Sequence, residues 1–435
     1  MLMFILVQII YYYNTHLNHP LHTNTIHYSV ISNVTSSVLW RFQVICHTVK
    51  AYNAQLLSED IKRVNNEEKV MNQDVFGPMY NNKISVVIIV QVHDRINYLR
   101  HLIKSLSIAK GINETLIIFS HDIWDDEMNT LVRSIKFAKV LQIFYPYSIQ
   151  THGNIFPGDS PNDCPSGVSK EQAKKLNCLN AEWPDHFGHY RTAKVAQIKH
   201  HWWWKAHRVF DELQTIRNYD GLVLFLEEDH YLTEDFLEVL SQMNNQRNKM
   251  EPLNDIICLG THATKLSRDK DNYKKVEVTY WHYGHHNMGM AFDRKVWEKI
   301  KMCRQAFCNF DDYNWDFSLS HLSFSCMKAS LRVMFLKGPR IFHMGECGFH
   351  NKKNIECNTE EVVRKIISKL EQLHHLLYPR SLIFEKFRTT KQRKLLGNGG
   401  WGDKRDREMC IRMDILHSTT IEQVLRPLVS ENKMI

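Results

Sequence analysis

The sequence predicts an α/β fold in which at least part of the β-sheet is parallel. Residues 84–92, ISVVIIVQV, form a continuous β-branched run that is typical of a strand covered on both faces. In residues 95–111 apolar side chains recur at helical spacing before Gly111, and residues 114–122, ETLIIFSHD, follow as a second strand. A strand, a helix and a strand in that order predict a βαβ crossover, which joins parallel neighbours of one sheet.

The rest of the folded part continues to alternate strands and helices. Strands are predicted at residues 140–147, 221–231 and 255–261, a strand running into a helix at 286–300, another pair of strands at 332–343, and a helix at 190–213. The sequence contains no internal repeat and no low-complexity block. Ligands of parallel sheets gather at the carboxyl ends of the strands, so polar residues that directly follow these strands are the candidates for a site.

We expect the folded domain at residues 83–417, after a stem or linker at 14–82 and before a tail at 418–435. The second half of the stem, residues 51–82, is polar and charged and is expected to be partly helical. Residues 1–13, MLMFILVQIIYYY, carry no charge. As a helix they would reach only about 20 Å, against a hydrocarbon core of about 30 Å. They are interpreted as a truncated signal-anchor or a signal-peptide segment, with an unreliable amino terminus as an equal alternative, because flanking basic residues are missing.

Composition favours a globular protein of an oxidising compartment. The chain has 435 residues, 43% of them hydrophobic, which is enough for a large core. Its formal net charge of +8 is spread along the chain, so it only weakly indicates an anionic ligand, and no Lys/Arg-rich block marks a nucleic-acid-binding arm. Ten cysteines without a paired CxxC zinc pattern, and Asn-X-Thr sequons at Asn33 and Asn113, favour secretory routing.

The run GLVLFLEEDHY at residues 221–231 ends on three acids. An apolar strand places its last residues at the rim of the sheet, where clustered carboxylates repel one another unless a cation or a donor joins them. Glu227, Glu228 and Asp229 therefore indicate a metal site, with a solvated loop as the equal alternative. His343 directly follows another predicted strand, where an imidazole can complete the coordination of a divalent ion, although a structural role is the commoner one for a histidine.

Two other groups of polar residues have side chains suited to catalysis or ligand binding. The segment FDDYNWDFS sets Asp316 and two more acids among aromatic residues, which can stack on sugar rings and can raise the pKa of a carboxyl to suit a general base. Aromatic core packing beside a solvated loop is the more frequent explanation. The segments QVHDR at 91–95 and SHDIW at 120–124 follow the first two strands, and they can contact a base, a ribose and a diphosphate, with Arg95 suited to bidentate phosphate binding.

Two further motifs resemble binding sites only superficially. KHHWWWK at residues 199–205 has adjacent histidines, but adjacent residues on a helix point about 100° apart, which disfavours a shared metal. Lys199 and His201 can still reach a phosphate. GNGGWGD at residues 397–403 lacks the GK[ST] ending and the following helix of a phosphate-binding loop, so it is interpreted as a turn.

The chain closely resembles the alpha-1,6-mannosyl-glycoprotein 2-beta-N-acetylglucosaminyltransferase family over about residues 51–415, in the ordered motifs QVHDR, SHDIW, DCP, FGHYR, KHHWWWK, FLEEDHY, HNMGMAF, FDDYNWDF, FHMGEC and NGGWGD. The resemblance implies a GT-A glycosyltransferase fold, with a Rossmann-like mixed sheet flanked by helices, in a type II protein of the Golgi membrane whose catalytic domain lies in the lumen. It also implies an inverting transfer of GlcNAc from UDP-GlcNAc, with Mn2+, in β1,2 linkage to the α1,6-arm mannose of an N-glycan on a glycoprotein. No nucleic-acid partner is expected, and a homodimer remains an alternative to a monomer.

The resemblance also implies roles for particular residues. Asp316 falls where the family has its catalytic base, and Asp229 and His343 fall where it has its metal ligands. Asn287 and Trp315 lie where acceptor contacts are expected. The segments expected to contact the donor nucleotide-sugar contain Gln91, Val92, His93, Asp94, Arg95, Asp122, Gln197, Ile198, Lys199, His200 and His201.

The chain departs from the family pattern at a few positions. Asp94 stands where the family usually has Asn, so its side chain is expected to face the base or solvent rather than the diphosphate. Glu346 replaces a customary Asp near His343, and Cys258 is alone where some members have a closely spaced pair. By the family pattern the expected disulfides are Cys164–Cys178, Cys303–Cys326, Cys308–Cys410 and Cys347–Cys357, which leaves Cys46 and Cys258 free. Within the acidic run Glu227, Glu228 and His230 are expected to orient Asp229 or to face the acceptor.

Three other functions are kept open. An N-acetylglucosaminyltransferase I-like enzyme or an O-mannose β1,2-GlcNAc transferase would share the fold and the donor but use another acceptor. A non-catalytic glycan-binding descendant is disfavoured because Asp229, Asp316 and His343 are all retained. A metal-dependent phosphohydrolase also uses acids at strand ends, and it would release free phosphate from UDP-GlcNAc.

Overall fold

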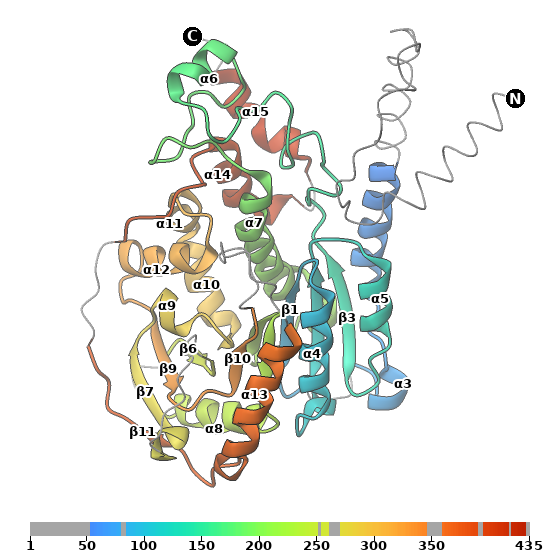
Figure 1. The fold of residues 1–435 in the computed structure, drawn as a ribbon, viewed down its shortest axis with the longest axis vertical. Coiled ribbons are helices and arrows are strands. Elements are labelled where there is room, and N and C mark those ends of the chain that lie inside the picture. The colour runs from blue at the N-terminus through green and yellow to red at the C-terminus, as the bar shows by residue number, and fades with distance from the viewer. Residues whose placement is uncertain are drawn as a thin grey trace, which may run out of the picture. The chain divides into compact units, whose positions relative to one another are not determined.

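A mixed nine-stranded sheet organises the part of the chain that the structure describes (Figure 1). Its strands, in spatial order, are β11 (Ile383–Phe384), β7 (Lys275–Tyr280), β9 (Arg332–Leu336), β6 (Ile256–Cys258), β8 (Met290–Phe292), β4 (Val223–Glu227), β1 (Val87–Val92), β2 (Leu116–His121) and β3 (Lys139–Phe144). Strands β4, β1, β2 and β3 run parallel, whereas β8 is antiparallel to both β4 and β6. A second, antiparallel sheet pairs β5 (His230–Leu232) with β10 (Ile341–His343). The predicted α/β class with a partly parallel sheet is confirmed.

Helices cover both faces of the large sheet because side chains of a strand alternate between the faces. On β1, Val87 and Ile89 pack with the tryptophans of α7, and Ile88 and Val90 pack with α4, α5 and α8. The helices are α3 (Gln73–Phe76), α4 (Ile96–Ser107), α5 (Asp126–Arg133), α6 (Lys170–Leu176), α7 (Ala193–His207), α8 (Phe236–Arg247), α9 (Tyr283–His286), α10 (Arg294–Met302), α11 (Arg304–Asn309), α12 (Trp315–Ser325), α13 (Thr359–Leu373), α14 (Lys404–Ile411) and α15 (Ile421–Glu431). The predicted βαβ crossover is β1, α4 and β2.

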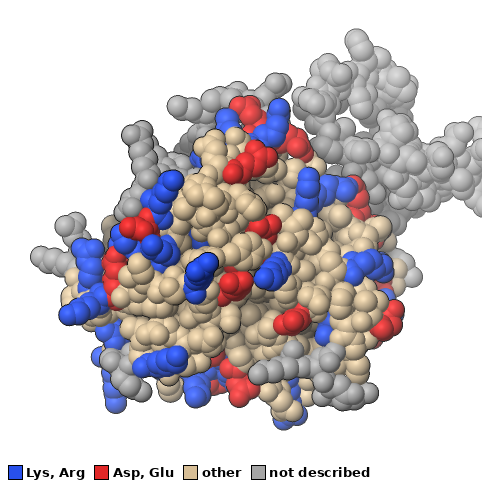
Figure 2. Space-filling view, turned by 90° about the horizontal axis from the view of Figure 1, so that it is seen from below, with Lys and Arg blue, Asp and Glu red and all other residues tan. Residues whose placement is uncertain are grey.

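This computed structural model describes residues 53–79, 84–250, 254–260, 270–345, 359–389, 395–416 and 419–431. The predictions for residues 1–13, Asn33, Cys46, Glu346 and the pair Cys347–Cys357 lie outside these ranges. No helix within them is both long enough and apolar enough to cross a membrane. On the face shown in Figure 2, Lys and Arg side chains are interspersed with Asp and Glu, so that face lacks the broad basic area typical of nucleic-acid binding.

Part of the expected stem belongs to the folded unit. Residues 54–67 are helical, and they lie in the same compact unit as the sheet. Asn65 binds the backbone of Phe144 on the edge strand β3, with Nδ2 donating to the carbonyl at 2.7 Å and Oδ1 accepting from the amide at 2.8 Å. Met71 forms an antiparallel bridge with Val140 of the same strand. This part of the expected stem therefore covers the edge of the sheet at β3, which its polar composition did not indicate.

Two strand predictions differ from the structure in their connections. The run at residues 221–231 is not one strand, because the chain turns at Glu228 and Asp229 and starts β5 after them. The two strands predicted at residues 332–343 exist, but they do not pair with each other: β9 lies in the large sheet and β10 pairs with β5. Hydrophobic patterning reports burial of a strand and not the identity of its neighbour, so these pairings could not be inferred from it.

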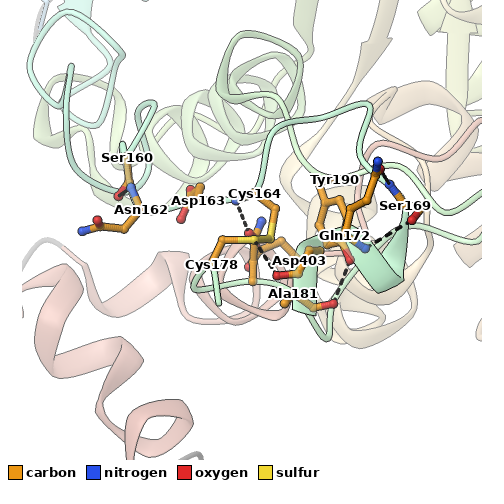
Figure 3. Close-up of a disulfide and its surroundings, with 12 residues drawn as sticks. Ser160, Asn162, Asp163, Cys164, Ser169, Gln172, Cys178, Ala181, Tyr190 and Asp403 are labelled. Carbon is orange, nitrogen blue, oxygen red and sulfur yellow. Dashed lines mark hydrogen bonds between the residues drawn. A yellow bond between two sulfur atoms is a disulfide. The ribbon is translucent and has the colours of Figure 1, made fainter. Parts of the chain in front are cut away.

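Three disulfides occur among the described residues, and they are pairs that the resemblance implied: Cys164–Cys178, Cys303–Cys326 and Cys308–Cys410. Cys258 is buried, and it forms no disulfide with any cysteine in the part of the chain that the structure describes. Figure 3 shows the first disulfide beside Tyr190 and Asp403. Asn180 connects this loop to the start of α14, since its Oδ1 accepts from the Cys164 amide at 2.7 Å and its Nδ2 donates to Asp403 Oδ2 at 3.0 Å.

The Cys308–Cys410 disulfide should stabilise the fold by tying α14 to α11. Replacing both residues by alanine is expected to lower the free energy of unfolding by about 2–4 kcal/mol, because the unfolded chain regains the freedom that the crosslink removes. Urea denaturation under oxidising conditions measures this change. Cys258→Ala removes a buried sulfur but no crosslink, so it should cost less. Recovery of Cys410 as a free thiol by non-reducing peptide mapping would contradict the pairing.

Candidate active site

Polar side chains from the ends of β1 and β2 meet those of helix α7. The strand register pairs Val92 with His121, so His93 and Asp122 follow directly at the same edge of the sheet. Their side chains approach to 2.5 Å between His93 Nδ1 and Asp122 Oδ2, and Gln197 Nε2 donates to the same oxygen at 3.0 Å. Burial alone would raise the pKa of Asp122, but the attraction and hydrogen bond of His93 lower it to about 2. This carboxylate is therefore ionised at neutral pH.

A second imidazole ring, that of His201, lies next to this pair. Its Nε2 is 2.8 Å from Ser120 Oγ and its Nδ1 is 3.8 Å from Asp122 Oδ2. His93, Asp122 and His201 are thus brought together by β1, β2 and α7, and their nitrogen and oxygen atoms lie close enough together to hold a metal ion. The ring of His93 is partly exposed, whereas His201 is fully buried. His93 is the member of the trio that can most readily contact a ligand.

The acids that follow β4 are held by Arg95. Its Nε donates to Glu228 Oε1 at 2.6 Å and its Nη1 donates to Asp229 Oδ2 at 2.9 Å. Glu228 also accepts from the backbone amide of His93 at 2.7 Å. Glu228 and Asp229 are both buried, so the guanidinium compensates two carboxylates that would otherwise repel each other. Arg95 is paired with these acids, and its side chain is still 27% exposed, which leaves it accessible to a phosphate.

The small second sheet brings His343 to Asp229 across a long stretch of sequence. Residue pairing of β5 with β10 sets His343 opposite His230, the residue after Asp229. The amide of Met344 donates to the carbonyl of Asp229 at 2.7 Å, and His343 Nε2 is 3.3 Å from Asp229 Oδ2. The hydrogen bond and charge of His343 hold the pKa of Asp229 well below its usual range, against the opposing effect of burial. The two residues form a carboxylate and imidazole pair at the rim of the sheet.

This pair fits a divalent metal ion. Asp229 Oδ1 is buried and has no hydrogen-bond partner among the described residues, and the other oxygen faces the partly exposed ring of His343. A Cβ on Gly345 would lie 2.4 Å from Asp229 Oδ2 and 2.7 Å from His343 Nε2, so the absence of a side chain there keeps the space open. Glu227, Asp229 and His230 form a second geometric candidate. His230 is buried and its Nδ1 accepts from the Glu227 amide at 3.2 Å, so the more exposed His343 is better placed to complete an open coordination shell.

Asp316 lies in the first turn of α12 and is partly buried. Its Oδ2 accepts from Asn287 Nδ2 at 2.8 Å, and its Oδ1 accepts from the amide of Phe317 at 2.9 Å. Burial raises the pKa of Asp316 to about 7, and the nearby charges of Asp312 and Glu227 act in the same direction. A carboxyl with this pKa can exchange a proton near neutral pH. Glu227 at the end of β4 is close enough for its charge to act on this carboxyl.

The loop before Asp316 is anchored by the glycine-rich segment. Asp312 forms a bridge with Gly399, and its carboxylate accepts from the amide of Asn398 at 2.8 Å. A Cβ on Gly397 would lie 2.0 Å from the carbonyl of Asp311, and Gly399 has φ +78°, so glycine is required at both positions. Residues 397–403 form no helix or strand of their own, but the expectation that no helix follows them is wrong, since α14 begins at Lys404 with Asp403 as its N-cap. The segment supports the loop that carries the candidate base.

Some residues expected in the site lie elsewhere. Lys199 is fully buried and donates to the carbonyls of Phe310 at 3.1 Å and Asp312 at 3.0 Å, so it does not face the donor cluster. His200 points to α14, where its Nε2 is 3.0 Å from Asp406 Oδ1. Adjacent residues of α7 face different neighbours, and the resemblance could not show which of them faces the donor side.

Trp315 is also placed differently from the expectation of an acceptor contact. Its ring is 4.6 Å from the ring of Trp202 at an interplanar angle of 1°, and the residue is only 7% exposed. It is a core residue that fixes the start of α12. Among the other expected donor residues, Val92 and Gln91 are buried, Ile198 is partly buried, and Asp94 is exposed.

Two features of the site could not be found from residue type. Glu228 accepts from the His93 amide and from Arg95, so it links the ends of β1 and β4. Gly345 provides the space beside Asp229 and His343. The only sequence signal for either was its position, since Glu228 lies inside the acidic run and Gly345 follows His343 by two residues.

Comparisons with known proteins identify the family of this chain. The sequence matches a protein family described as N-acetylglucosaminyltransferase II (MGAT2) over residues 58–410. The alpha-1,6-mannosyl-glycoprotein 2-beta-N-acetylglucosaminyltransferases of Rattus norvegicus and Homo sapiens are each 43% identical over 351 residues, which cover 80% of this chain and 78% and 77% of those proteins. The protein of that name from Arabidopsis thaliana is 34% identical over 344 residues, 78% of this chain and 76% of its own length.

Similarity to solved structures is much lower. A crystal structure of S. aureus TarS 1-349 has a TM-score of 0.31 and 9% identity, and it covers 78% of this chain and 76% of that chain, which is too distant to support an inference. Membership therefore follows from the sequence matches, which extend over most of the chain and include the ends of β1, β2 and β4 and the start of α12. The chain belongs to the N-acetylglucosaminyltransferase II family, with the mixed-sheet GT-A fold expected of it.

Proposed function

We propose that the protein transfers GlcNAc from UDP-GlcNAc, with inversion, in β1,2 linkage to the α1,6-arm mannose of an N-glycan. The observation that carries the proposal is the family match, which spans residues 58–410 and includes Asp229, Asp316 and His343. The geometry supports it, because the carboxylate and imidazole pair and a carboxyl with a pKa near 7 share one edge of the sheet. These are the groups that an inverting transfer to a hydroxyl requires.

In this proposal Asp316 is the general base. Its carboxylate accepts the proton of the mannose 2-hydroxyl while that oxygen forms a bond to the anomeric carbon of GlcNAc. The bond from the anomeric carbon to the diphosphate breaks on the opposite face, and its electron pair leaves with UDP. Asn287 supports the role, since its amide donates to Asp316 Oδ2 at 2.8 Å and can orient the carboxylate toward the acceptor.

We also propose Mn2+ as the metal, held by Asp229 and His343. The buried Asp229 Oδ1 without a partner and the space beside Gly345 support this assignment. When bound, the ion supplies positive charge to the diphosphate as it departs. Arg95 adds a guanidinium at the same edge of the sheet, where it can bind a phosphate oxygen while remaining close to Glu228.

The donor nucleotide-sugar is proposed to bind along the ends of β1 and β2. His93 and Arg95 have partly exposed side chains there, and Asp122 and Gln197 complete the same hydrogen-bonded cluster. A Golgi location with the catalytic unit in the lumen is proposed from the family and from the three disulfides, which persist in oxidising compartments.

One acceptor assay tests the function. The protein is incubated with UDP-GlcNAc, Mn2+ and one of two glycans, with or without GlcNAc on the α1,3 arm. Mass spectrometry should show that one GlcNAc is added to the glycan that already has GlcNAc on that arm. Preferred transfer to the glycan without that GlcNAc would favour the N-acetylglucosaminyltransferase I-like alternative. Release of phosphate without a glycosylated product would indicate a phosphohydrolase. Calorimetric binding of the glycan without any transfer would indicate a non-catalytic protein.

Asp316→Asn should abolish transfer while leaving donor binding intact, because the amide cannot accept the proton. We expect kcat to fall by at least about 100-fold, with UDP affinity in Mn2+ unchanged. For the unaltered protein, kcat/KM should rise as pH increases through about 7, since the base must be ionised and burial raises the pKa of Asp316 to about 7. Asp60→Asn, at an exposed carboxyl in the first helix, serves as the control. Near-normal turnover of Asp316→Asn would rule out this base.

Gly345→Ala should weaken metal binding without removing a ligand. The added Cβ would lie 2.4 Å from Asp229 Oδ2, so the carboxylate and the His343 ring must separate. We expect the Mn2+ dissociation constant, measured from free Mn2+ by electron paramagnetic resonance, to rise by about 10-fold or more. Gly167→Ala is the matched control, since its Cβ would meet nothing within 4 Å. Unchanged Mn2+ affinity in Gly345→Ala, or full activity in EDTA, would contradict the assignment of the metal site.

A further inference from the structure

Asp312 has a fully buried carboxylate that the proposed mechanism does not use. Its Oδ1 accepts from the backbone amide of Asn314 at 2.7 Å and from Asn314 Nδ2 at 3.0 Å. Its Oδ2 accepts from the backbone amide of Asn398 at 2.8 Å and from Asn398 Nδ2 at 2.9 Å. Burial raises the pKa of Asp312, but a proton on either oxygen would face these N–H donors, so the arrangement requires the ionised carboxylate.

This contact changes how helix α12 begins. Asn314 is the N-cap residue of α12, and its side chain makes no capping hydrogen bond to the helix, which the structure describes in full. An N-cap side chain normally accepts from the second or third amide of its helix, which here are the amides of Asp316 and Phe317. Because Asp312 Oδ1 can only accept, Asn314 turns its amino group toward Asp312 and leaves both amides uncapped.

One of the uncapped amides binds the candidate base. The Phe317 amide donates to Asp316 Oδ1 at 2.9 Å, and Asn287 Nδ2 donates to Asp316 Oδ2 at 2.8 Å. Each oxygen of the base thus has a donor, which fixes the plane of the carboxylate and leaves lone pairs for the proton of a hydroxyl. If Asn314 capped the helix instead, its Oδ1 would compete with Asp316 for the Phe317 amide.

Asp312 itself is held by parts of the chain that are distant in sequence. It forms the bridge with Gly399, and Lys199 Nζ donates to its carbonyl at 3.0 Å and to that of Phe310 at 3.1 Å. Burial lowers the pKa of Lys199 well below its usual range, but a neutral amine still has two N–H donors for these two carbonyls. Asp312 is therefore a fixed acceptor beside the start of α12, whatever the charge of Lys199.

We propose that Asp312 is a positioning residue of the reaction: it holds the side chain of Asn314 and thereby leaves the Phe317 amide to the base. The inference rests on the proposed function, because it takes Asp316 to be the base that receives the proton of the mannose 2-hydroxyl. Since Asp312 is fully buried, it acts through Asn314 and not on the substrate.

The first test compares a single variant with a double variant. Asp312→Ala releases Asn314 to cap α12, so we expect kcat to fall by about 10-fold, as for the loss of one well-oriented hydrogen bond, with KM for UDP-GlcNAc unchanged. Adding Asn314→Ala removes the competing side chain, and kcat should recover by about 3-fold or more. A purely structural role of Asp312 predicts no such recovery. An unchanged kcat in Asp312→Ala, or a double variant no faster than Asp312→Ala, would overturn the proposal.

These rates are compared well above pH 7. The charges of Asp312 and Glu227 raise the pKa of Asp316, which is about 7, so removing Asp312 should lower that pKa. At a pH where Asp316 is ionised in every variant, differences in kcat report its hydrogen bonds and not its protonation.

Asp311, the preceding residue, supplies the matched control. Its carboxylate accepts from the amides of His186 at 2.7 Å and Trp401 at 3.1 Å, and neither of these belongs to α12 or its N-cap. Asp311→Ala therefore weakens the same loop without releasing Asn314. Adding Asn314→Ala to Asp311→Ala should give no gain in kcat. A gain as large as that in the Asp312→Ala background would overturn the proposal.

A variant that keeps Asp312 covers the case in which Asp312→Ala does not fold. Asn314→Asp cannot donate to Asp312, and the two carboxylates repel each other, so the new side chain should turn and cap α12. We expect kcat to fall by about 10-fold in Asn314→Asp and clearly less in Asn314→Ala, which cannot cap. Equal rates for these two variants would overturn the proposal.

The unaltered protein separates the two levels of the account. If it transfers no GlcNAc, the proposed function has failed, and this inference fails with it. If it transfers GlcNAc but the recovery in the double variant is absent, only this inference has failed.

Discussion

The arrangement of the site depends on one interaction, in which Arg95 forms hydrogen-bonded ion pairs with Glu228 and Asp229. The turn after β4 buries these two carboxylates side by side. Glu228 and Asp229 would repel each other without a cation, and the guanidinium lies within 2.9 Å of both. Glu228 also accepts from the amide of His93, so the same contact joins the ends of β1 and β4. With Asp229 held in this way, the pairing of β5 with β10 can present His343 to it. The proposed donor site and the proposed metal site are therefore parts of one hydrogen-bonded network.

Helix α7 connects this network to the rest of the fold. Its buried polar residues reach different neighbours: Lys199 the loop before α12, His200 the acid Asp406 of α14, and His201 the end of β2. Each of these contacts satisfies a polar group that would be costly to bury alone. The three consecutive tryptophans that follow them, Trp202, Trp203 and Trp204, pack in the core against the sheet. The helix thus combines the packing that stabilises the domain with the contacts that fix the loops of the site.

The parts of the fold that could be predicted are those whose local pattern has one common explanation. The β-branched runs of β1 and β2 and the periodic helix between them are of this kind, and the location of polar residues at their carboxyl ends follows from topology. The approach of His343 to Asp229 depends on the pairing of two short strands far apart in sequence, and only the resemblance indicated it. Residue type could not reveal that Trp315 stacks on Trp202 in the core, or that Asn65 covers the edge of β3. In each case tertiary contacts decide the role, and these leave no periodic signal.

The central claim is that Asp229 and His343 hold the metal beside the diphosphate while the cluster around His93 binds the nucleotide. Anomalous diffraction from crystals grown with Mn2+ and UDP tests it most directly. We predict a single strong manganese peak about 2.0–2.2 Å from a carboxylate oxygen of Asp229 and from a ring nitrogen of His343, with the uracil near His93 and Asp122. A manganese peak instead among His93, Asp122 and His201, with none at Asp229, would contradict the account.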